Sequence, residues 1–289
     1  MKYGMNLLLY TDDACADSQI ATIAGLKRIG FDGVEVPVFD LRTERYAALG
    51  KRLDDLGLER TAVTVSDADH DPISPDPAVR AKAVERLKRV IDCCAAANIG
   101  LLVGPYYAAL GKFSGSGPTT QEWHHGVEAI RAITAHAAAA KVRLSLEFLN
   151  RFEIYLLNTA ADSARFVGDI GSPGVGVLYD TFHANIEEKD PAKAIAACAA
   201  VLNHVHVSES DRSTPGTGQV AWQATFAALR RANYDGWLTI EAFGQLLPSL
   251  AAATKIWRKM YANEEQLARD GLAFIKAGWQ RQAVSAEAR

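Results

Sequence analysis

The fold of this chain is indicated by residues 142–153, Val-Arg-Leu-Ser-Leu-Glu-Phe-Leu-Asn-Arg-Phe-Glu. Apolar and polar residues alternate up to Glu147, and this period of two predicts a buried β-strand. Glu147 lies where the apolar run ends, and Glu153 follows in the predicted loop. A buried carboxylate is costly unless it is paired or bound to a metal. The end of this strand therefore predicts a functional site.

Strand and helix patterns alternate along the whole chain. Besides 142–148, strands are predicted at 4–10, 33–37, 58–66, 99–104, 175–180, 203–208 and 236–241. Helices are predicted at 18–29, 43–56, 77–97, 121–140, 159–169, 191–200, 221–231 and 249–277. Eight alternating pairs in 289 residues predict an α/β fold, a single (β/α)8 TIM barrel. We expect the catalytic domain to cover 1–282 and a flexible tail to cover 283–289.

The first predicted loop argues against the other common α/β architecture. A doubly wound nucleotide-binding sheet would have a glycine-rich phosphate turn after its first strand. The sequence there is Tyr10-Thr11-Asp12-Asp13, which contains no glycine.

Composition excludes several classes of protein. The net charge of −3 gives no general attraction to a phosphate backbone, so we expect no nucleic-acid partner. The four cysteines show no CxxC spacing and are expected to be reduced, inert thiols. The first residues lack a signal-peptide pattern, and no apolar stretch is long enough to span a bilayer. We expect a cytoplasmic protein without a membrane partner.

The last four predicted strands each carry a potential metal ligand at the end where barrel active sites lie. These ligands are Glu147, Asp180, His206 and Glu241. Any one of them alone would be read as a helix cap, an ion-pair partner or a core histidine. At the same level of four adjacent strands, they predict one metal centre. Three carboxylates and one imidazole suit Mn²⁺, Mg²⁺ or Co²⁺ better than a thiolate-rich zinc site.

Further polar residues follow these strand ends within the reach of a loop. Glu153, His183 and Arg212 would be surface charges elsewhere, but beside a metal they are natural anchors for hydroxyl and carbonyl oxygens. Weaker candidates for substrate contacts are Tyr107 and Phe243 in an apolar wall, and Glu35 and Ser66 at the ends of two early strands. His204 lies one layer deeper than His206, and we assign it a structural role.

Four motifs around these residues resemble the ketose 3-epimerases, the group of the D-tagatose, D-psicose (allulose) and L-ribulose 3-epimerases. Leu-Asn-Arg-Phe-Glu stands at 149–153 and Asp-Thr-Phe-His-x-Asn-Ile-Glu-Glu at 180–188. His-x-His-x-Ser-Glu stands at 204–209 and Arg-x-x-Pro-Gly-Thr-Gly at 212–218. The resemblance covers roughly 3–280 and implies a xylose-isomerase-like TIM barrel.

The resemblance also implies an activity and its residues. It implies isomerases that epimerise free ketoses at C3 through a cis-enediolate, converting pairs such as D-tagatose and D-sorbose, D-fructose and D-psicose, or L-ribulose and L-xylulose. The four predicted ligands match the family's metal ligands, usually for Mn²⁺, Co²⁺ or Mg²⁺. Glu147 and Glu241 match its proton-transfer pair, and Glu153, His183 and Arg212 match its contacts to the O1–O3 end of the ketose. The family is commonly dimeric or tetrameric.

The chemistry of the reaction leads to the same residues without the resemblance. Inverting C3 requires two acid–base groups on opposite faces of the carbon, with a Lewis acid to stabilise the enediolate.

Three alternatives stay open. The same site could isomerise aldoses and ketoses, or hydroxypyruvate. An apurinic-endonuclease type would need more rim histidines and a basic face. A sugar-binding barrel without chemistry would have lost Glu147 or Glu241, and both are present.

Overall fold

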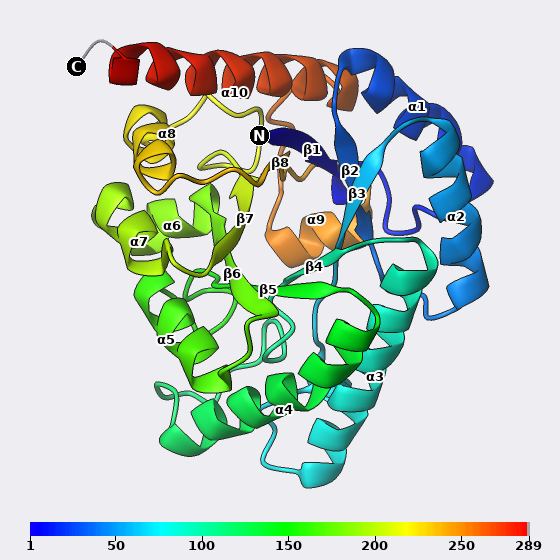
Figure 1. The fold of residues 1–289 in the computed structure, drawn as a ribbon, viewed down its shortest axis with the longest axis vertical. Helices are drawn as coiled ribbons and strands as arrows, with labels where there is room; N and C mark the ends of the chain where they lie inside the picture. The colour runs from blue at the N-terminus through cyan, green and yellow to red at the C-terminus, as the bar shows by residue number, and fades with distance from the viewer. Residues whose placement is uncertain (288–289) are drawn as a thin grey trace.

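The computed structural model describes residues 1–287, and its centre is a closed barrel of parallel strands in sequential order (Figure 1). The strands are β1 Lys2–Asn6, β2 Gly33–Pro37, β3 Glu59–Val63, β4 Leu101–Gly104, β5 Arg143–Glu147, β6 Val175–Asp180, β7 Leu202–Val207 and β8 Trp237–Ile240. β1 pairs with both β2 and β8, which closes the ring. The predicted (β/α)8 TIM barrel is confirmed.

Helices surround this barrel. They are α1 Ile20–Ile29, α2 Thr43–Asp55, α3 Pro77–Ala96, α4 Thr120–Ala139, α5 Ala160–Ile170, α6 Thr181–Glu187, α7 Pro191–Cys198, α8 Trp222–Arg231, α9 Pro248–Thr254 and α10 Glu264–Glu287. Asp76 and Asp190 cap α3 and α7 with their side chains, each followed by proline in the first turn. Thr119 and Glu122 form a capping box at the start of α4. Local capping therefore fixes where several helices begin.

The strand register brings the predicted site residues to one level. Asp180 pairs with His206 across β6 and β7, and Glu147 pairs with Leu178 across β5 and β6. The Glu241 amide donates to the carbonyl of Val207, which extends the β7–β8 pairing by one residue. Since successive side chains of a strand alternate between the two faces, these carboxylates and the imidazole all point into the barrel.

Several predicted elements differ in extent from the structure; the strand predicted at 58–66, for example, ends at Val63. The strand predicted at 4–10 ends at Asn6, because the Asn6 side chain accepts a hydrogen bond from the Leu8 amide and starts the 3₁₀ helix Leu7–Leu9. The helix predicted at 249–277 is two helices: α9 ends at Thr254 and is followed by Lys255 in a left-handed conformation with φ 62°, and α10 begins at Glu264.

The remaining part of the C-terminus is helical where it is described. α10 runs to Glu287, through most of the segment predicted as a flexible tail, and 288–289 lie outside the described residues.

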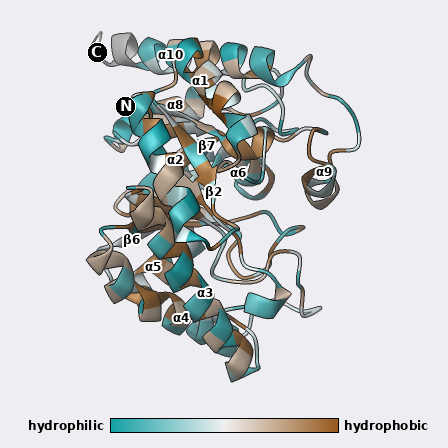
Figure 2. Cartoon of the chain, turned by 90° about the vertical axis from the view of Figure 1, so that its right-hand side faces the viewer, coloured by the Kyte–Doolittle hydropathy of each residue, from teal (hydrophilic) through white to brown (hydrophobic). Residues whose placement is uncertain are grey.

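None of the described helices is both long and apolar enough to cross a membrane. In the side view, α9 stands apart from the other helices (Figure 2).

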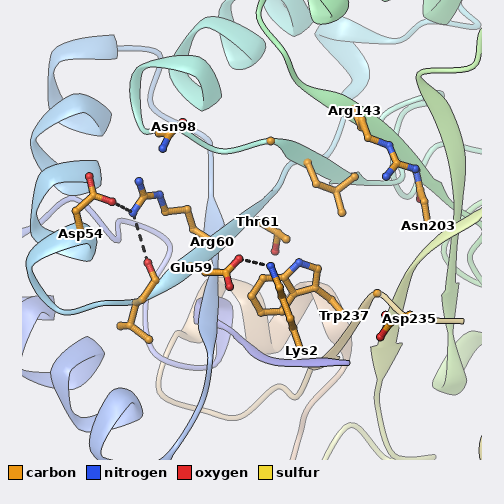
Figure 3. Close-up of a pocket in the computed structure, with 14 residues that line it drawn as sticks. Lys2, Asp54, Glu59, Arg60, Thr61, Asn98, Arg143, Asn203, Asp235 and Trp237 are labelled. Atoms are coloured by element: carbon orange, nitrogen blue, oxygen red, sulfur yellow. Dashed lines mark hydrogen bonds and ion pairs between the residues drawn. The ribbon is translucent and has the colours of Figure 1, made fainter.

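The N-terminal end of the barrel holds a cavity of about 490 Å³ (Figure 3). Its charged side chains are largely neutralised within the cavity: Lys2 pairs with Glu59, and Arg60 lies 2.7 Å from Asp54. In barrels of this class, this end contributes stability and the opposite end carries the chemistry. The functional site is therefore to be sought at the ends of the strands, where Glu147 and its neighbours lie.

Candidate active site

Three carboxylates and one imidazole meet at the C-terminal ends of β5–β8. His206 Nδ1 lies 3.5 Å from Glu147 Oε1, 3.7 Å from Asp180 Oδ2 and 3.4 Å from Glu241 Oε1. One ligand atom from each of the four residues lies within 4.8 Å of every other, and all four residues are buried. The structure thus brings the four predicted ligands to one point.

The chemistry of this cluster fits a divalent cation. His206 Nδ1 and Glu147 Oε1 are buried and have no hydrogen-bond partner in the described structure. Burial disfavours the imidazolium form of His206, yet the surrounding carboxylates, Glu35 and Glu241 foremost, raise its pKa well above the ordinary value. Concentrated negative charge beside an unpartnered ring nitrogen is the environment that a metal ion stabilises.

Glu147 and Glu241 differ in their electrostatic surroundings. Burial, followed by the charge of Glu241, raises the pKa of Glu147 to about 8. Burial also opposes the ionisation of Glu241, but His206 and Arg212 outweigh it and lower the pKa of that carboxyl to about 2. The pKa values of the two carboxyls are therefore shifted in opposite directions, which is typical of an acid–base pair.

Arg212 supplies the positive charge at this end of the barrel. Its guanidinium is buried, and Nη1 donates to Glu241 Oε2 at 2.6 Å and to Asp180 Oδ2 at 3.1 Å. The same group stacks over the rings of Phe182 and Phe243, at 3.9 and 5.0 Å. Arg212 itself has φ 62°, so the loop places it in a left-handed conformation to reach the cluster.

His183 lies between two hydrogen-bond donors. Its Nδ1 faces the backbone amide of Asn150 at 3.0 Å, and its Nε2 faces Arg212 Nη2 at 2.8 Å. Burial and then the Arg212 charge lower the pKa of His183 well below its usual value, so the ring is neutral. A neutral imidazole has one acceptor nitrogen and one N–H. Nδ1 accepts from the fixed backbone amide, and Nε2–H therefore points at Arg212.

Asn150 connects two of the predicted substrate contacts. Its side-chain amide donates to Glu153 Oε1 at 2.8 Å and lies 3.0 Å from His183 Nδ1. Its own side-chain oxygen accepts from the amide of Phe152, which tightens the loop after β5. Glu153 and His183 are consequently held side by side by one residue.

Comparison with known proteins identifies the family of the chain. Residues 23–278 match the family model described as a xylose isomerase-like TIM barrel. The chain belongs to this family. Within it, the chain is 33% identical to the L-ribulose 3-epimerase of Methylomonas sp. strain DH-1 over 279 residues, 96% of this chain and 97% of the relative. It is 32% identical to the ketose 3-epimerase of Arthrobacter globiformis, over 96% of both chains.

Solved structures give the same grouping for this xylose isomerase-like barrel. A structure of an L-ribulose 3-epimerase matches with a TM-score of 0.92 and 34% identity, covering 99% of this chain and 97% of that chain. The D-allulose 3-epimerase from Methylomonas sp. in complex with D-allulose matches with a TM-score of 0.90 and 32% identity, covering 96% of both. These relatives are isomerases, and the resemblance to ketose 3-epimerases is confirmed.

The weaker candidates lie in different surroundings. Phe243 is buried against Arg212 at the rim. The buried Tyr107 donates its hydroxyl to the carbonyl of Leu157, and the buried Ser66 donates to the carbonyl of Tyr106. Glu35 is fully buried and contacts His206 instead of the rim. As substrate contacts these four remain predictions, and the hydrogen bonds of the last three point to roles in packing and support.

A cavity of about 230 Å³ beside Arg212 was not anticipated from the sequence. It is lined by Phe182, Asp211 and Arg212 and, at the end of α9 and in the break before α10, by Thr254, Lys255, Ile256, Trp257, Arg258 and Met260. Ile256 is buried there, whereas Trp257 is 69% exposed. The apolar residues of this break could have predicted the wall of the cavity only if the sequence had also shown that the helix is interrupted there. Asn150 was also missed, although it stands inside the Leu-Asn-Arg-Phe-Glu motif.

Proposed function

We propose that this protein is a metal-dependent ketose 3-epimerase that interconverts free ketoses by proton transfer between Glu147 and Glu241. The observation that carries the proposal is the position of these two carboxylates. They come from β5 and from the end of β8, three strands apart in a ring of eight, and they meet in one buried cluster. The relatives named as ketose 3-epimerases support the same reaction class.

The chain's own residues would hold the cation. Glu147, Asp180, His206 and Glu241 offer three carboxylates and one imidazole, a set suited to Mn²⁺, with Co²⁺ or Mg²⁺ as other candidates. When bound, the ion would supply Lewis-acid stabilisation of the negative charge that develops on the ketose oxygens. We propose one divalent ion per subunit.

The two glutamates divide the proton transfer. One carboxylate removes the proton from C3 of the ketose, which leaves an enediolate, and the other delivers a proton to the opposite face of C3. Glu147 Oε1 has no hydrogen-bond partner and is free to exchange a proton, whereas Glu241 is held by Asn6 and Arg212. Because the reaction is reversible, the roles exchange with the direction.

The contact between His183 and Arg212 supports a site for substrate oxygens. His183 Nε2–H and Arg212 Nη2 are both donors, and they face each other at 2.8 Å without an acceptor. A substrate oxygen that accepts from both groups would satisfy them, once the two nitrogens move apart to admit it. We assign this place to the O1–O3 end of the ketose, with Glu153 beside it to accept from a substrate hydroxyl.

We further propose that residues 1–282 act as one catalytic domain in the cytoplasm, as a homodimer or homotetramer. Phe152 and Trp257 support an oligomer, because they are 73% and 69% exposed on loops at the active-site end. Light scattering of the purified protein tests this; a monomer at micromolar concentration would contradict it.

The experiment that tests the function is a panel of sugars. D-Fructose, D-tagatose, L-ribulose and, as a fourth substrate, hydroxypyruvate are each incubated with the Mn²⁺-loaded protein, and the products are separated by chromatography. We expect the 3-epimer of at least one ketose. An aldose product would instead support an aldose–ketose isomerase, and conversion of hydroxypyruvate alone would support the isomerase of that acid.

A further inference from the structure

Beneath the four proposed ligands lies a second buried layer that centres on Glu35. Its Oε1 accepts from His206 Nε2 at 2.7 Å and from Asn6 Nδ2 at 3.1 Å. Its Oε2 accepts from the hydroxyl of Thr61 at 2.7 Å and lies 3.0 Å from His204 Nε2. Both oxygens of this fully buried carboxylate are therefore occupied by partners inside the barrel.

This arrangement fixes which nitrogen of the His206 ring faces the proposed metal site. An ionised carboxylate can only accept hydrogen bonds, so the nitrogen that faces Glu35 must carry a hydrogen. Nε2–H is thus directed at Glu35, and Nδ1 is the nitrogen left to face Glu147, Asp180 and Glu241. The orientation of a ligating histidine and its basicity are commonly set by a carboxylate on its other nitrogen.

Asn6 extends the same support to Glu241. The side-chain nitrogen of Asn6, Nδ2, lies 3.1 Å from Glu35 Oε1 and 3.0 Å from Glu241 Oε1, so it bridges the two carboxylates. Asn6 in turn is fixed because its side-chain oxygen accepts from the Leu8 amide. The β1–β2 register pairs Asn6 directly with Glu35, and the β2–β3 register pairs Glu35 with Thr61.

We infer that Glu35 is a positioning residue, which holds His206 in the tautomer whose Nδ1 can bind the metal and which aims Glu241 through Asn6. The inference rests on the proposed metal site but assigns Glu35 neither to the metal nor to the substrate. Its effect is therefore on metal affinity, which can be measured without turnover.

The first test is a titration of metal-free protein with Mn²⁺, followed by electron paramagnetic resonance of the free ion. We expect one ion per chain in the parent protein and affinity that is 10- to 100-fold weaker in Glu35→Gln, the usual effect of removing a carboxylate behind a ligating histidine. Thr61→Val is the matched control, because it removes a neighbour of Glu35 that contacts none of the four ligands; we expect less than about a 3-fold change.

A double-mutant cycle separates positioning from a general effect of negative charge. In a His206→Asn background, Glu35→Gln should cost little further affinity for Mn²⁺. The effects of two substitutions do not add when one residue acts through the other. A full additional loss in that background would overturn the inference. Circular dichroism and melting temperature establish that each variant is folded. If Glu35→Gln does not fold, Glu35→Asp retains the charge but shortens the reach to His206, and parental affinity in that variant would also overturn the inference.

The titration distinguishes the two levels of the proposal. If the parent binds no Mn²⁺, both the metal-dependent function and the role of Glu35 are overturned. If the parent binds one ion and the Glu35 variants bind it equally well, only the role of Glu35 is overturned. Two ions per chain would also contradict the inference, because Glu35, His204 and His206 would then form a ligand set of their own.

Discussion

Replacement of Arg212 by alanine should make the protein dependent on its metal for stability. The guanidinium is buried and contacts Glu241 at 2.6 Å and Asp180 at 3.1 Å. Removing one partner of a buried ion pair leaves the other charge uncompensated, which costs about 3–5 kcal/mol. We expect the metal-free Arg212→Ala variant to melt roughly 6–20 °C below the parent, from about 2–4 °C per kcal/mol for chains approaching this size.

A divalent cation would neutralise the same two carboxylates, so Mn²⁺ should recover much of this loss. The rise in melting temperature on adding Mn²⁺ should then be larger for Arg212→Ala than for the parent. By linkage, each 1.4 kcal/mol recovered corresponds to about tenfold tighter Mn²⁺ binding. Turnover of the ketose should still fall, because a charge-assisted hydrogen bond to substrate oxygen, worth about 1.5–3 kcal/mol, is lost.

The assay is thermal melting of chelated and Mn²⁺-loaded protein, monitored by circular dichroism. Arg269→Ala is the control, since this exposed arginine pairs with Glu265 one turn away on α10, and exposed pairs contribute about 0–1 kcal/mol. Equal Mn²⁺-induced shifts in the parent and in Arg212→Ala would refute the reasoning, because the arginine and the metal would then not share the same carboxylates.

Three further perturbations test other parts of the site. Glu147→Gln and Glu241→Gln should each lower turnover by at least about 10²–10⁴-fold with the fold retained, and substantial activity in either would contradict the two-base mechanism. Removing metal with a chelator should abolish epimerisation and Mn²⁺ should restore it, whereas full activity after verified metal removal would contradict metal dependence. Burial opposes ionisation of Glu209, but hydrogen bonds from backbone amides, including those of Val220 and Gly216, lower its pKa overall. The stability from Glu209 is therefore present above the ordinary carboxyl pKa and is lost as pH falls through the lowered one, so Glu209→Gln should be less stable at pH 7 and approach the parent in acid; a pH-independent difference in melting temperature would contradict this.

The end of a strand could be predicted from the sequence where an apolar run stops at a charged residue. Glu147, Asp180 and Glu241 each end an apolar run, and the barrel then brings these ends to one rim. The location of the proposed ligands therefore followed from period-two alternation and strand order. Their convergence does not depend on loop conformation, which is why the sequence was sufficient for it.

Depth within the barrel could not be predicted in the same way. Alternation places Glu35 on the inner face, but it does not say that the register sets it beside Asn6 and Thr61, below the rim. The break between α9 and α10 was also hidden, because Lys255 adopts a left-handed conformation that is uncommon for residues other than glycine. The cavity beside Arg212 depends on that break, so it could not be anticipated.

The central claim is that Glu147 and Glu241 exchange a proton at C3 of a ketose. Epimerisation in deuterium oxide, with nuclear magnetic resonance of the product, tests it most directly. We expect each molecule of 3-epimer formed early in the reaction to carry deuterium at C3 and none at C1. Deuterium at C1 or C2 would contradict the account. Inversion without any deuterium incorporation would also contradict it, provided that the carboxyl protons are known to exchange rapidly with the solvent.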